Sequence, residues 1–135
     1  MRREITIDGN NFNNIEEFYC EMDKLLTQDL NWETGHNLDA FNDLLRGGFG
    51  VHEDGEPILL KWINYSKSKE NLGYEETVKY YEEILEKCHP NSIGHVQKLL
   101  RNAKQYKGKT LIDIIIEIVL DNDNSGHDCK LELID

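Results

Sequence analysis

The chain has 135 residues, of which 26 are acidic and 15 are basic, so its net charge is −11. A field of that sign repels phosphate groups, and we expect no direct binding to nucleic acids or to anionic membranes. With 39% hydrophobic and 30% charged residues, the composition is that of a soluble globular protein, and the length suits one domain with a single core.

The sequence also predicts a compartment. No stretch is long and apolar enough to span a bilayer, and residues 1–8 form a strand-like pattern without the apolar segment of a signal peptide. Cys20, Cys88 and Cys129 are far apart and form no C-x-x-C pair. We therefore expect a cytoplasmic protein with reduced thiols, and a buried position for Cys20.

Hydrophobic periodicity predicts alternating strands and helices. Alternation indicates a strand at the N-terminus, and the apolar run at 58–63, bounded by turn residues, indicates a central strand covered on both faces. The segment 111–120 has isoleucines that favour a strand, but acidic residues four apart and the Thr110–Asp113 cap pattern favour a helix. The predicted elements are strand 3–8, helices 14–27 and 37–47, strand 58–63, helix 66–72, a helical hairpin within 75–107, helix 111–120 and strand 129–134.

Three strands separated by helices require crossover connections, which indicates a small three-stranded parallel sheet packed with helices and therefore the α/β class. The helix at 37–47 has two different faces. Leu38, Phe41, Leu44 and Leu45 recur at helical spacing and can be buried, while Asp39, Asn42, Asp43 and Arg46 face outward. This outward face is either an ordinary solvated surface or a docking surface for a cationic partner.

A second motif indicates possible calcium binding. Asp121, Asp123, Ser125 and Glu132 have the spacing of oxygen ligands in an EF-hand loop. However, the residues after Glu132 continue a strand-like pattern, whereas an EF-hand requires a helix there. The same residue types also form ordinary polar turns, so a turn is the main interpretation and a calcium-binding module over 121–132 is an alternative.

No known catalytic or cofactor motif is present. There is no P-loop, nucleophile elbow or dinucleotide-binding glycine pattern, and the five histidines show no metal-ligand spacing on one helix. Asp39 and Asp43 could act as an acid and a base, but they lie on a predicted exposed face without a pocket. We therefore expect no enzyme activity, cofactor or metal site.

The helix at 37–47 resembles a known family. Asn37-Leu38-Asp39-Ala40-Phe41-Asn42-Asp43-Leu44-Leu45, preceded by Gly35, is similar to the second helix of the barstar family of intracellular ribonuclease inhibitors. The resemblance continues in the Asp8-Gly9 turn, in segments 57–62 and 66–69, and in the closing strand. It covers about 1–73 and 109–135, and it leaves the hairpin at 75–107 as an insertion within one barstar-like domain.

The resemblance implies an inhibitor of a secreted microbial ribonuclease that is monomeric when free. The second helix and the loop before it would cover the basic active site of the enzyme. There, Asp39 and Asp43 would take the places of RNA phosphates. The other partner-binding residues implied by the resemblance are Trp32, Glu33, Gly35, Asn37 and Asn42.

Four positions depart from the family pattern. Glu33-Thr34 stands where the family has aromatic residues, Asn42 stands where the best-known member has tryptophan, and Arg46 replaces a small polar residue. A positive charge on the docking face weakens binding to a basic cleft. The alternatives are therefore an immunity-type binder of a non-nuclease toxin, or of another protein partner, and altered or lost inhibition.

Overall fold

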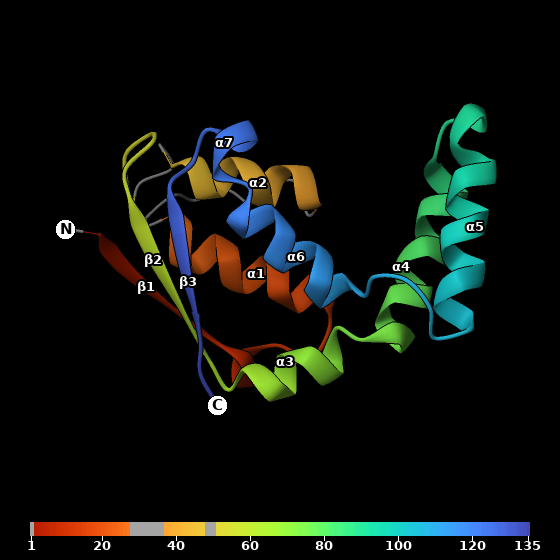
Figure 1. The fold of residues 1–135 in the computed structure, drawn as a ribbon, viewed down its shortest axis with the longest axis horizontal. Coiled ribbons are helices and arrows are strands. Elements are labelled where there is room, and N and C mark those ends of the chain that lie inside the picture. The colour runs from red at the N-terminus through yellow and green to blue at the C-terminus, as the bar shows by residue number, and fades with distance from the viewer. Residues whose placement is uncertain (1, 28–36, 48–50) are drawn as a thin grey trace.

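The computed structural model describes residues 2–27, 37–47 and 51–135, except for the side chains of residues 124 and 125. Three parallel strands form one sheet in the order β1-β2-β3, and the described helices pack on one of its faces or extend beyond it (Figure 1). The elements are β1 Arg3–Asp8, α1 Ile15–Leu26, α2 Leu38–Arg46, β2 Ile58–Ile63, α3 Tyr65–Asn71, α4 Tyr74–Lys87, α5 Ile93–Lys104, α6 Leu111–Leu120, α7 Asn122–Ser125 and β3 Cys129–Leu133, with short 3-10 turns at Gly9–Asn11 and Pro90–Ser92. The predicted α/β class and the three-stranded parallel sheet are confirmed.

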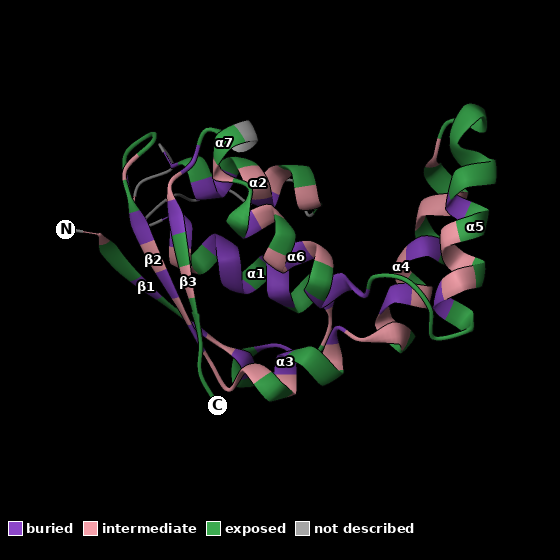
Figure 2. Cartoon of the chain, viewed as in Figure 1, coloured by how far each residue is buried: buried purple, intermediate pink, exposed green. Residues whose placement is uncertain are grey.

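The central strand β2 is covered on one face only. Ile58, Leu60 and Trp62 are buried, while the alternate residues Leu59 and Lys61 are half-buried. Helices α1 and α6 lie against the buried face, and purple segments mark this contact in Figure 2. The prediction of a strand covered on both faces is therefore wrong, because there is no second helical layer over the described part of the sheet.

Local sequence signals explain where the helices begin. The Asn14 side chain accepts a hydrogen bond from the Glu17 amide at 2.8 Å at the start of α1. Thr110 and Asp113 form a complete capping box at the start of α6. A cap satisfies amide groups that have no partner within the helix, so these polar residues fix the helix starts. The helical interpretation of 111–120 is correct.

Aromatic side chains form the centre of the main core. The Phe18 ring stacks on Trp62 with a centroid distance of 5.8 Å. Phe18 and Phe41 pack edge to face with a centroid distance of 5.3 Å. The buried Trp62 indole donates a hydrogen bond to Ser68 Oγ at 2.9 Å, so its polar group keeps a partner inside the core.

The helices α4 and α5 form a hairpin with a core of its own. Tyr81, Val96 and Ala103 are its buried residues, and Figure 2 shows mostly exposed residues on the outer side of α5. Tyr80 packs against both this core and the main core, which joins the hairpin to the rest of the molecule.

The cysteines differ in exposure. Cys20 is exposed on α1, so the prediction of a buried Cys20 is wrong. The apolar positions of α1 face the core and place Cys20 on the opposite side. Cys129, at the start of β3, is buried, and this burial raises the pKa of its thiol to about 12.

Thr77 provides a test of how the hairpin is attached. Its hydroxyl donates to the Gly73 carbonyl at 2.7 Å and accepts from the Leu111 amide at 2.9 Å, and Thr77 is fully buried. We expect Thr77→Val to lower the free energy of unfolding by about 1–3 kcal/mol, because a buried amide loses its acceptor. Urea denaturation measures this loss. The exposed Thr6→Val serves as the control, and equal stability of the two variants would contradict this role of Thr77.

Candidate functional site

Residues at both ends of helix α2 define where it begins and ends. The Asn37 side chain accepts a hydrogen bond from the Ala40 amide at 2.7 Å and so caps the first turn. Gly47 follows the last residue with φ of 102°, a conformation that a residue with a side chain rarely adopts. The helix is therefore short and has well-defined ends.

The two faces of α2 are oriented as the sequence predicts. Phe41, Leu44 and Leu45 are buried in the main core, while Asp39 and Asp43 are exposed. The buried side chains fix the rotation of the helix about its axis. The two carboxylates consequently point away from the core.

Arg46 partly neutralises this acidic face. Its guanidinium lies 3.9 Å from the Asp43 carboxylate and 3.6 Å from that of Asp54, and all three side chains are about half exposed or more. Exposed pairs of this kind contribute about 0–1 kcal/mol. In the described part of the chain, Asp39 has no ion pair, so it is the less compensated of the two helix carboxylates.

The charge of Asp39 also affects Tyr80, a residue of the hairpin helix α4. Burial raises the pKa of the Tyr80 hydroxyl above its ordinary value, and the nearby Tyr81 and Asp39 side chains raise it further. Asn37 and Tyr80 line the same groove, so the start of α2 and helix α4 are neighbours.

The other predicted contact residues fall into two groups. Asn37 is exposed, but its side-chain oxygen is engaged in the cap, and Asn42 is half-buried with an Oδ1 atom that is buried without a hydrogen-bond partner. Trp32, Glu33 and Gly35 lie outside the described residues. The structure thus brings Asp39, Asp43, Asn37 and Asn42 together on one short helix.

A groove of about 310 Å³ lies beside the start of α2, between α1 and α4. We call it the α1–α4 groove. Sequence reasoning missed it, because periodicity does not show where the hairpin packs. The residues that line it include Ile15, Glu16, Asn37, Tyr80, Glu83 and Lys87.

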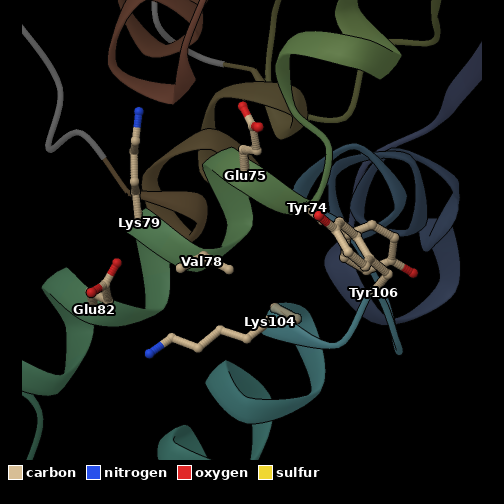
Figure 3. Close-up of a pocket in the computed structure, with 8 residues that line it drawn as sticks. Tyr74, Glu75, Val78, Lys79, Glu82, Lys104 and Tyr106 are labelled. Carbon is tan, nitrogen blue, oxygen red and sulfur yellow. The ribbon is translucent and has the colours of Figure 1, made fainter.

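A second hollow, of about 370 Å³, belongs to the hairpin alone (Figure 3). Tyr74 and Tyr106 meet at one end, edge to face, with a centroid distance of 5.6 Å. Glu82 and Lys104 lie toward the other end. No residue of α1 or α2 is among its described lining residues, so this hollow is separate from the acidic helix.

The segment 121–132 does not adopt an EF-hand loop. Residues 122–125 form α7, and the Asn122 amide pairs with the backbone of Cys129 in both directions, at 2.9 and 3.1 Å. Glu132 lies in β3, opposite Lys61 of β2. Within the described residues, no group of three or more histidine, cysteine or acidic side chains could hold a metal ion. The segment connects a helix to a strand.

The match to a protein family decides the identity. The family model described as Barstar (barnase inhibitor) matches residues 2–133. This chain belongs to the barstar family. The barstar family is a family of inhibitors, and its fold is consistent with the α/β arrangement seen here. No curated protein matches the sequence. Among the described residues, no helix has the length and apolar character required to cross a membrane.

The cap of α2 gives a prediction about this barstar-family helix. We expect Asn37→Ala to lower the free energy of unfolding by about 1 kcal/mol, because the Ala40 amide loses its acceptor. Asn37→Asp is the control, since aspartate also accepts this hydrogen bond. Urea denaturation compares the two variants, and an alanine variant as stable as the aspartate variant would contradict the role of the cap.

Proposed function

We propose that this barstar-family protein inhibits a microbial ribonuclease by placing the exposed face of α2 over the basic active site. The observation that carries the proposal is the exposure of Asp39 and Asp43 on a helix whose opposite face is buried. Carboxylates form strong hydrogen bonds with arginine and lysine, as phosphates do. The two aspartates would therefore replace RNA phosphates in the enzyme.

The rigidity of α2 supports this function. The cap at Asn37 and the buried Phe41, Leu44 and Leu45 hold the helix before a partner arrives. A preorganised surface binds more tightly because less conformational entropy is lost on association.

The charge of the whole chain supports it as well. With a net charge of −11, the protein attracts a basic enzyme from a distance. Opposite potentials accelerate the encounter of two proteins, and a desolvated charge pair can dominate their affinity. The complex of barnase with barstar is itself the standard example of both effects. We propose the cytoplasm as the compartment and a monomer as the free state.

One observation favours a second candidate. Arg46 lies on the acidic face within 4 Å of Asp43, and a strongly basic cleft would repel it. An immunity-type binder of a less basic, non-nuclease toxin accommodates this arginine better. Inhibition assays with a guanyl-specific microbial ribonuclease separate the two candidates, since only the first predicts inhibition.

We expect Asp39→Asn to weaken inhibition of that ribonuclease by at least about tenfold, which corresponds to about 1.4 kcal/mol. Asp43→Asn should have a smaller effect, because Arg46 already compensates part of its charge. Inhibition constants measure both changes. Glu70→Gln is the control, since it removes one negative charge from an exposed site on α3. Full inhibition by the Asp39→Asn variant would refute the proposed mechanism.

Arg46 gives a prediction of the opposite sign. We expect Arg46→Gln to strengthen inhibition a few-fold at low salt, because it removes a positive charge that repels the enzyme. The gain should shrink near 1 M salt, where the Debye length is about 3 Å. Arg101→Gln, at an exposed position on α5, changes the net charge equally and serves as the control. Weaker inhibition by the Arg46 variant would show that the arginine contacts the partner favourably.

A further inference from the structure

The α1–α4 groove is continuous with the acidic face of α2. Asn37, the capping residue of α2, is one of its lining residues and precedes Asp39 by two positions. Tyr80, on the opposite side, is close enough for the charge of Asp39 to raise the pKa of its hydroxyl. A protein seated on the N-terminal half of α2 would therefore also face this groove.

The hairpin wall of the groove is fixed to the rest of the molecule. The Glu76 carboxylate of α4 accepts a hydrogen bond from the Ile15 amide, at the start of α1, at 2.8 Å. One residue later, the Thr77 hydroxyl binds the Leu111 amide at the start of α6. Tyr80 packs against both hydrophobic cores. These contacts hold α4 beside α1 and preform the groove.

The lining of the groove fits a long basic side chain. Ile15, Tyr80 and Ile84 supply apolar surface, and Glu16 and Glu83 supply a carboxylate from α1 and from α4. Lysine and arginine combine an apolar stem with a charged head, so they can use both kinds of surface. The C-terminal end of α4 adds negative potential from its last carbonyl groups.

We propose that the α1–α4 groove receives a lysine or arginine side chain of the same ribonuclease that α2 binds. This inference rests on the proposed function and extends it, because it makes the hairpin a second contact surface. The groove would add affinity for enzymes that carry a basic residue at the matching position. The hairpin would thus contribute to the choice of partner.

Two neighbouring glutamates on α4 provide a matched test. Glu83 lines the α1–α4 groove, whereas Glu82 lines the hairpin hollow of Figure 3, and both are exposed. With the guanyl-specific ribonuclease as the probe, we expect Glu83→Gln to raise the inhibition constant about threefold or more and Glu82→Gln to leave it unchanged. Glu83→Arg should weaken inhibition further, because it places a like charge beside the incoming side chain.

Lys87 tests whether the side chain that enters the groove is positively charged. It lies in the groove and would repel a basic side chain, so Lys87→Gln should strengthen inhibition, while Lys98→Gln on the exposed side of α5 should not. Circular dichroism should be used to check that each variant is folded.

The outcomes separate this inference from the proposed function. If Asp39→Asn weakens inhibition but the Glu83 variants match Glu82→Gln, the groove proposal is overturned and the function of α2 stands. If the unmodified protein does not inhibit the ribonuclease, both proposals are overturned.

Discussion

The Phe18 ring lies against both Trp62 of β2 and Phe41 of α2, and this aromatic contact determines how α2 is presented. Burying a phenylalanine, leucine or isoleucine side chain contributes about 1.5–3 kcal/mol, so Phe41, Leu44 and Leu45 together outweigh any exposed ion pair on the helix. The core therefore sets the rotation of α2, and the charged residues take the positions that remain. Asp39 and Asp43 are exposed as a consequence of packing, before any partner is considered.

Contacts with the main body also determine the position of the hairpin. Its own core has few buried residues, Tyr81, Val96 and Ala103, so its orientation depends on contacts with the main body. Glu76 and Thr77 bind backbone amides at the starts of α1 and α6, where a helix leaves amides without internal partners. Each contact satisfies a polar group that otherwise carries a desolvation cost. The hairpin consequently lies beside the N-terminal ends of other helices.

The sequence predicts most elements because their signals are local. Helical spacing and the Thr110–Asp113 cap identify α6 despite its isoleucines, and alternation identifies β1. One misassigned feature is the covering of β2. Lys61 interrupts the apolar run there and lies on the half-buried face, where it pairs with Glu4 at 3.2 Å. A single charged residue in such a run indicates a face without a helical layer.

Other features depend on contacts between distant residues. The EF-hand spacing at 121–132 is overridden because Asn122 binds the backbone of Cys129 and starts a helix instead of a loop. The α1–α4 groove depends on a hydrogen bond between Ile15 and Glu76, which are 61 positions apart. Periodicity within a segment contains no information about such a contact. The exposed acidic face of α2 could thus be predicted from the sequence, and the groove beside the hairpin could not.

Arg46 makes the negative potential differ between the two ends of the acidic face of α2. It lies in the last turn of α2, where a positive charge interacts favourably with the helix carbonyls, and it is close to both Asp43 and Asp54. Negative potential is therefore weakened at the C-terminal end of the helix and kept at the N-terminal end, near Asp39. The α1–α4 groove, with Glu16 and Glu83, begins at that same end. Under the proposed function, a basic partner would consequently be centred over the start of α2, where both the helix and the hairpin can reach it.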